Sequence, residues 1–325
     1  MPVLPDGPLD TADLFRATVA ILRRRLRLFV AIAALPIAVA FVAAFVVGGV
    51  LAAGYTTAAT GASGWLASPL VGAAAVLLIM GLVILAFQVK AVGMMITGAS
   101  ASVGGESPSF HDIWRASRGY LRRMAPVLVL GLLLGVMLAV SPSLALALGA
   151  GLFHLGGSAL VLGSILIGLV IAVTVAAVWV GTKLLYLQHT VALERAGSLS
   201  AIGQSWTMTR GAFWSTLGRW MSAVIVTVLL AVAVNLATRL FTVAAVSLDH
   251  FADSPAKAAA IVTALVPAIV LAAVAQAVIQ FLTTPFLTIY STCMYLDRRR
   301  ELAAAAGPED PAKPTTGGQT LAQPV

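Results

Sequence analysis

The chain has 325 residues, of which 60% are hydrophobic and only 10% are charged, and its mean hydropathy is +1.00. Charged residues make up about a quarter of an ordinary soluble domain, so this composition excludes a soluble protein and predicts a chain that crosses a membrane several times. The formal net charge of +8 is also typical of nucleic-acid-binding proteins, but its placement along the chain, described below, predicts no nucleic-acid partner.

The regular structure is predicted to begin with a short amphipathic helix. Asp10 is a favoured N-cap residue, and Asp13 stands three positions further on, where a carboxylate stabilises a helix N-terminus. The predicted apolar face consists of Phe15, Val19, Leu22 and Leu26. Arginines crowd the last turns, so we expect the helix to lie in the membrane interface, with its apolar face in lipid and its guanidinium groups on phosphates.

The same pattern returns before the third long apolar run. Ser109 takes the N-cap position and Asp112 follows three residues later. The residues that recur at matching positions are Asp13/Asp112, Arg16/Arg115, Ala17/Ala116, Leu22/Leu121, Arg23/Arg122 and Arg24/Arg123. The apolar face predicted for this second helix consists of Ile113, Trp114, Ser117, Tyr120, Leu121 and Met124. Such self-similarity indicates an internal repeat.

A third, weaker copy precedes the fifth apolar run. Ser198 or Ser200 is the expected N-cap, and Trp206-x3-Arg210-Gly211 repeats Trp114-x3-Arg118-Gly119. The two later units also end alike, since Leu193-Glu194-Arg195 matches Leu296-Asp297-Arg298. The plan is therefore three units that run in the same direction through the membrane, over residues 10–97, 109–197 and 198–302.

Six apolar runs are long enough to cross a bilayer, which takes about 20 residues. They cover residues 28–51, 70–96, 125–148, 158–180, 221–246 and 258–282, and the last extends toward Leu296. The predicted fold is all-α, a polytopic membrane protein with six transmembrane helices in three parallel repeats of an interfacial amphipathic helix and a transmembrane hairpin. Residues 1–302 form the membrane domain, and residues 303–325 are expected to be a disordered cytoplasmic tail.

The basic residues are concentrated on one side of this topology. All Lys and Arg residues except Arg239 and Lys257 fall on the side that holds both termini. The positive-inside rule therefore predicts a multi-pass protein of the bacterial inner membrane with both termini in the cytoplasm. Anionic phospholipids are the expected partners of the following residues: Arg16, Arg23, Arg24, Arg115, Arg122, Arg123, Arg210, Arg298 and Arg299.

Two segments carry a family resemblance. Residues 201–214, with Ser205-Trp206 and Arg210-Gly211, and the ending Tyr295-Leu296-Asp297-Arg298-Arg299-Arg300-Glu301 after Pro285 are similar to the membrane domain of the glycerophosphoryl diester phosphodiesterase family. The chain departs from the family pattern at Leu302, where Gly is expected. The resemblance implies a stand-alone six-span bacterial member without the catalytic barrel, so the barrel's phosphodiesterase chemistry is not inherited.

Few residues suggest chemistry inside the membrane. The histidines show no metal-ligand spacing, so no metal, cofactor or catalytic residue is predicted. Polar side chains in membrane spans are functional hypotheses by default. Asn235 and Arg239 share one helical face of the fifth run, and Gln276 and Gln280 share a face of the sixth, which predicts a polar track between these two spans.

Three functions remain open from the sequence. The first is a non-enzymatic membrane protein that binds or organises anionic lipids, or assists transport or envelope assembly, with a membrane-protein partner or a second copy as its protein contact. The second is a permease or channel-like transporter that uses the polar track. The third is a membrane-embedded lipid enzyme, for which the sequence offers no assembled catalytic cluster.

Overall fold

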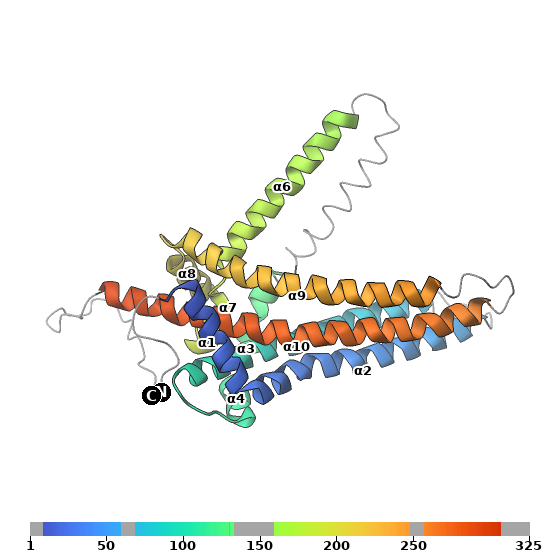
Figure 1. The fold of residues 1–325 in the computed structure, drawn as a ribbon, viewed down its shortest axis with the longest axis horizontal. Helices are drawn as coiled ribbons and strands as arrows, with labels where there is room; N and C mark the ends of the chain where they lie inside the picture. The colour runs from blue at the N-terminus through green and yellow to red at the C-terminus, as the bar shows by residue number, and fades with distance from the viewer. Residues whose placement is uncertain (1–8, 60–68, 130, 133–158, 248–256, 307–325) are drawn as a thin grey trace.

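The computed structural model describes residues 9–59, 69–129, 131–132, 159–247 and 257–306, and every regular element in these ranges is an α-helix. The first hairpin consists of α2 (Leu26–Ala59) and α3 (Pro69–Val103), which pack along each other (Figure 1). A second antiparallel pair consists of α9 (Phe213–Ser247) and α10 (Lys257–Ala306), and α10 also packs on α2 and α3. The all-α prediction is thereby confirmed.

Helix α6 (Ala159–Lys183) stands apart from these four helices. It meets α9 at one end and then diverges from the bundle, as Figure 1 shows. The third predicted span, 125–148, lies outside the described residues except for 125–129 and 131–132, which are helical. Six spans therefore stay a prediction.

Five of the described helices are long and apolar enough to cross a membrane: Leu26–Val46, Ala75–Val103, Gly168–Leu193, Phe213–Arg239 and Val274–Ala305. Large apolar side chains on these helices face outward, such as Phe45, Leu229 and Leu236. A hydrocarbon surface of this kind indicates a membrane protein.

The C-terminal helix is longer than expected from the sequence. Residues 303–306 belong to α10, so the helix continues past the predicted start of the tail at residue 303, and the disordered tail itself stays a prediction because residues 307–325 lie outside the described part of the chain. The physical reason is that the four alanines after Leu302 are strong helix formers. A helix of 50 residues is about 75 Å long, so α10 extends well beyond a membrane core of about 30 Å.

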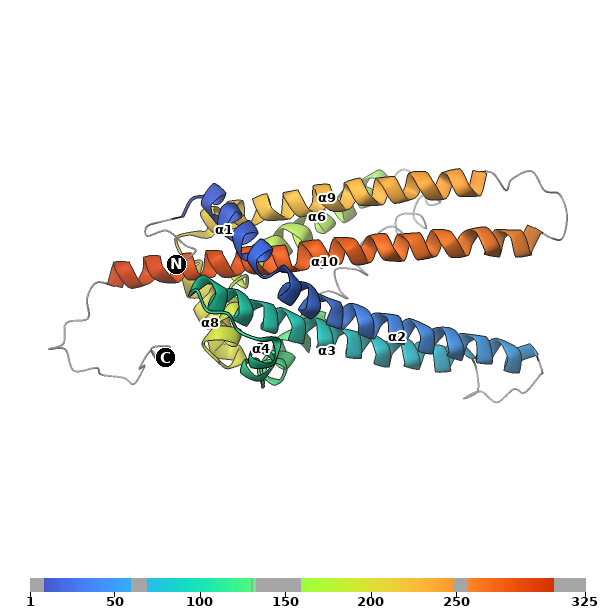
Figure 2. The same cartoon turned by 60° about the horizontal axis from the view of Figure 1, so that its bottom comes forward.

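Four short helices gather at one end of the bundle, which we call the short-helix end. They are α1 (Thr11–Arg24), α4 (Phe110–Ala116), α7 (Leu187–Leu193) and α8 (Ser198–Met208) (Figure 1), and α10 runs past them so that its last turns project beyond this end (Figure 2). The buried core also lies at this end, and it includes Phe29, Met94, Tyr186, Tyr290 and Tyr295.

Local capping follows the sequence prediction in two of the three cases. The Asp10 carboxylate accepts from the backbone N–H of Asp13, and Ser109 and Asp112 form a reciprocal capping box. The third prediction is wrong, because the N-cap of α8 is Gly197. The Ser198 hydroxyl donates instead to the carbonyl of Arg123, and Ser200 donates to the carbonyl of Gly197.

The buried face of α1 also differs from the predicted one. Leu14, Ala17, Thr18 and Ile21 are the buried residues of this helix, whereas Val19 and Leu26 are 42% and 47% exposed. The helix packs on α10, and the Phe15 ring lies 5.1 Å from the ring of Tyr290. The apolar face of α1 is therefore covered by protein and not by lipid, because α10 offers an aromatic surface at this depth.

Candidate functional site

An ion pair between a partly exposed arginine and a buried aspartate holds the N-terminal segment at the short-helix end. Arg219 Nη1 of α9 lies 3.0 Å from Asp297 Oδ2 of α10, and Asp297 is only 2% exposed. Both groups also bind the backbone of Leu9: its N–H donates to Asp297 Oδ1 at 3.3 Å, and its carbonyl accepts from Arg219 Nη2 at 2.9 Å. The hydroxyl of Tyr290 donates to the Arg219 carbonyl. We call this group the Leu9 clamp.

A second carboxylate contacts α10 one turn away. Glu194 follows α7, and its Oε1 accepts from the Tyr295 hydroxyl at 2.5 Å. Arg299 Nε lies 3.6 Å from the same oxygen. The two acidic residues of the sequence match between Leu193-Glu194-Arg195 and Leu296-Asp297-Arg298 thus each pair with an arginine at this end, and Glu194 also accepts from a tyrosine.

Two lysines of membrane helices, one within α3 and one at the end of α6, bind the next short helix. Lys90 Nζ donates to the carbonyl and hydroxyl of Ser117 at 2.9 and 2.7 Å, and lies 4.8 Å from the centre of the Trp114 ring. Lys183 Nζ lies 5.4 Å from the centre of the Trp206 ring. Both contacts join a cation to an indole face and fix α4 on α3 and α8 on α6.

Arg298 does not face lipid, although the sequence includes it among the headgroup candidates. Its Nε donates to the carbonyl of Met208 at 2.9 Å, and its Nη1 pairs with Glu301 at 2.7 Å. Met208 is the last residue of α8, where unpaired carbonyls attract a cation. Arg298 therefore caps α8, and Arg299 is engaged with Glu194.

The remaining headgroup candidates are mostly exposed. Arg123 is half-buried, and its Nε donates to the carbonyl of Gly119 at 3.4 Å. The Arg16 side chain is 77% exposed, although it pairs with Asp13 on its own helix. We call the exposed set the basic collar, and it consists of Arg16, Arg23, Arg24, Arg115, Arg122 and Arg210. Its members lie on α1, on α4, at the start of the helix after Gly119 and after α8, all at the short-helix end.

Two carboxylates beside the collar are ionised more readily than usual. Hydrogen bonds from the Ser109 side chain and backbone lower the pKa of Asp112, and the backbone N–H of Asp13 lowers the pKa of Asp10. These acids cap α1 and α4 and therefore remain anionic at neutral pH.

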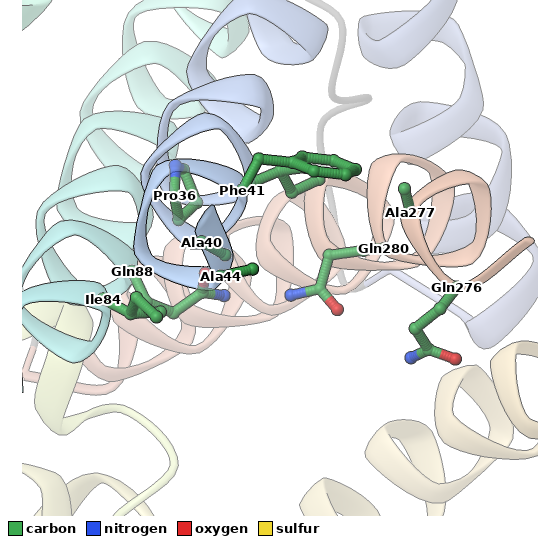
Figure 3. Close-up of a pocket in the computed structure, with 10 residues that line it drawn as sticks. Pro36, Ala40, Phe41, Ala44, Ile84, Gln88, Gln276, Ala277 and Gln280 are labelled. Atoms are coloured by element: carbon green, nitrogen blue, oxygen red, sulfur yellow. The ribbon is translucent and has the colours of Figure 1, made fainter. Parts of the chain in front are cut away.

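The four predicted track residues are placed differently from one another. Asn235 is exposed, and its amide donates to the carbonyl of Ala231 in its own helix at 2.8 Å. Arg239 is also exposed. Gln276 and Gln280 line a cavity of about 380 Å³ together with Gln88 of α3 and with Phe41 of α2. Figure 3 shows the amides of Gln88 and Gln280 pointing toward one another. We call this cavity the glutamine groove, and it lies between α10, α2 and α3.

A second cavity of about 410 Å³ lies between α3, α6, α9 and α10 and contains His189 and Ser291 in its lining. His189 is buried, and its Nε2 lies 3.2 Å from the Ser291 hydroxyl. Its ring stacks on Tyr295 at 5.3 Å between centroids. Its other ring nitrogen, Nδ1, is buried and has no hydrogen-bond partner among the described residues.

Comparison with protein-family models, curated proteins and solved structures gives no match. Within the described residues, no group of three or more His, Cys, Asp or Glu side chains is arranged to hold a metal ion. Sequence reasoning overlooked the pairing of Arg219 with Asp297 and the presence of Gln88 and Gln280 in the lining of one cavity. Neither had a local signal, because the partners lie on helices far apart in the sequence.

Proposed function

We propose that this chain is a non-enzymatic integral membrane protein whose basic collar binds anionic phospholipids and so organises lipids or assists transport or envelope assembly. One observation carries the proposal: the exposed arginines of three separate segments lie together at one end of an apolar helical bundle. Other basic side chains bind protein groups instead of facing outward, and these are Lys90, Arg219 and Arg298. Each free basic side chain near an anionic surface contributes about 1 kcal/mol.

The orientation follows from the same distribution. With the collar on the cytoplasmic side, both termini are cytoplasmic and the membrane is the bacterial inner membrane, in keeping with the positive-inside rule. Neither 52–68 nor 149–157, on the opposite side, contains Lys or Arg. The resemblance to the membrane domain of the glycerophosphoryl diester phosphodiesterase family supports this assignment and adds no activity to it.

We also propose that the three units are true repeats. Gly119 and Gly211 both adopt positive φ, at 76° and 78°, directly after the paired Trp114 and Trp206 helices. Lys90 and Lys183 lie over these two indoles. In the first unit Phe15 takes the place of the tryptophan and stacks on Phe286 of α10, with 5.7 Å between ring centroids. Each returning membrane helix thus binds a short helix, and the last one binds the first.

Native mass spectrometry from nanodiscs of mixed anionic and neutral phospholipid tests the collar. The double variant Arg24→Gln/Arg122→Gln removes two exposed charges from different helices. We expect its retention of anionic lipid to fall about 30-fold, since two contacts of about 1 kcal/mol are lost. The matched control Arg239→Gln/Lys257→Gln removes the same charge from the other end and should retain lipid like the wild type. Equal losses in both variants, or a loss in neither, would contradict the proposal.

The two alternatives have less support. A permease would use Gln276 and Gln280 as polar residues of its pathway, and both line the glutamine groove together with Gln88. A membrane-embedded enzyme would require converging acidic groups or histidines. Among the described residues that line the second cavity, His189 is the single histidine, and none is Asp or Glu.

A further inference from the structure

The glutamine groove contains three amides in an otherwise apolar setting. Gln88, Gln276 and Gln280 line it with Phe41 and Ile84, and among the described residues no Lys, Arg, His, Asp or Glu takes part in the lining. The three amides have no hydrogen-bond partner among the described residues. Unpaired amides are costly in hydrocarbon, where water does not satisfy them. Three of them in one groove therefore indicate a ligand.

The groove begins near the short-helix end and reaches deep into the bundle. Gln88 is two residues before Lys90, which binds α4. On α10, Phe286 contacts α1 at this end. Gln280 and Gln276 precede Phe286 by six and ten residues, so they lie about 9 and 15 Å from it along the helix axis, away from the short-helix end. The amides are thus spread from the expected headgroup level to about the middle of a hydrocarbon core of about 30 Å.

The shape of the groove is set by α2. Pro36, Ala40 and Ala44 are spaced four residues apart and line the same side of this helix. Their small side chains leave room between α2 and α10, while Phe41 and Ile84 offer apolar surface. A long apolar chain with uncharged acceptors near one end matches this surface.

We infer that the glutamine groove binds one ester-linked glycerolipid, with the amides of Gln88 and Gln280 donating to its ester carbonyls and the acyl chains lying on α2 and α3. Ester carbonyls lie just below the phosphate, at the depth where the groove begins. The uncharged lining excludes the phosphate itself, which stays at the headgroup level. This inference goes beyond the proposed function and does not depend on the collar arginines.

A competition between ester and ether lipids tests the inference. The protein is placed in nanodiscs that contain equal amounts of a diacyl phospholipid and its dialkyl ether analogue, with the same headgroup and chain lengths, and the retained lipids are measured by native mass spectrometry. We expect about a fivefold preference for the ester lipid, the ratio that one net hydrogen bond of about 1 kcal/mol gives.

The variant Gln88→Leu/Gln276→Leu/Gln280→Leu should lose this preference. Leucine has a similar volume and is favourable in hydrocarbon, so the variant is expected to insert and fold. It should keep the wild-type preference for anionic over neutral lipid, which the collar provides, and this separates the two proposals. The control Asn235→Leu removes an exposed amide of α9 and should keep the ester preference.

Three outcomes would overturn the inference: equal retention of ester and ether lipid by the wild type, an ester preference that survives in the triple leucine variant, or a dimer mass without retained lipid, which would assign the groove to a second copy of the chain.

Discussion

At the scale of single residues, position decides what each arginine does. Arg298 and Arg219 are bound by carbonyls and carboxylates of the core, whereas Arg23 and Arg24 are exposed. The sequence places all of them on one side of the membrane, but it does not reveal which carbonyls lie within reach. Arg298 meets the end of α8 only because α10 and α8 pack together, and this contact joins residues 90 positions apart.

The Leu9 clamp should be a main source of stability at the short-helix end. The variant Arg219→Met leaves the buried Asp297 without its partner, which costs about 3–5 kcal/mol for a pair of this kind. We expect a loss of this size in the free energy of unfolding, measured by denaturant titration in mixed micelles. The double variant Arg219→Met/Asp297→Leu should recover most of it.

The exposed pair of Asp13 and Arg16 provides the control for this prediction. Because the Arg16 side chain is 77% exposed, Arg16→Gln should change the free energy of unfolding by less than about 1 kcal/mol. A loss for Arg219→Met no larger than that for Arg16→Gln would show that the clamp does not stabilise the fold.

At the scale of helices, the local signals were predictable and the tertiary ones were not. The caps at Asp10 and Ser109 depend on residues three positions apart, so the sequence contains the whole interaction. The α8 cap was missed because Ser198 bonds to the distant Arg123. The face of α1 was missed because apolar residues surround much of this helix, and packing on α10 selects Leu14 and Ile21 over Val19.

The two candidate sites differ in how much of each can be predicted from the sequence. The exposed collar residues could be named because long-range charge asymmetry is visible in the sequence. The glutamine groove could not be assembled, because nothing near Gln88 in the sequence indicates that α3 approaches Gln280 of α10. Gln276 and Gln280 were paired with Asn235 by their shared presence in adjacent spans, and the structure places them with α2 and α3.

The turns between short and long helices give a prediction at this scale. Gly119 and Gly211 have φ of 76° and 78°, where an L-residue is strained by about 1–2 kcal/mol. Gly119→Ala and Gly211→Ala should each lower the free energy of unfolding by that amount. Gly203→Ala, inside α8 and with open space around it, should instead raise it by about 0.5–1 kcal/mol. Stabilisation by all three substitutions would contradict the assigned turns.

At the scale of the whole molecule, the proposed membrane orientation depends on one arrangement of the helices. The long apolar helices extend from the short-helix end (Figures 1 and 2), which also contains the core, the Leu9 clamp and the basic collar. If this end lies on the cytoplasmic surface, then α1, α4 and α8 all lie at the inner leaflet, and the arginines beside them reach the same layer of headgroups.

Cysteine accessibility tests this arrangement most directly. Single cysteines replace Arg24, Arg115 or Arg210 in a Cys293→Ala background, which removes a thiol that is already buried. A membrane-impermeant maleimide is then added to right-side-out and to inside-out vesicles. All three cysteines should react in inside-out vesicles and be protected in right-side-out ones. Reaction of any one of them in right-side-out vesicles would contradict a single basic face at the inner leaflet.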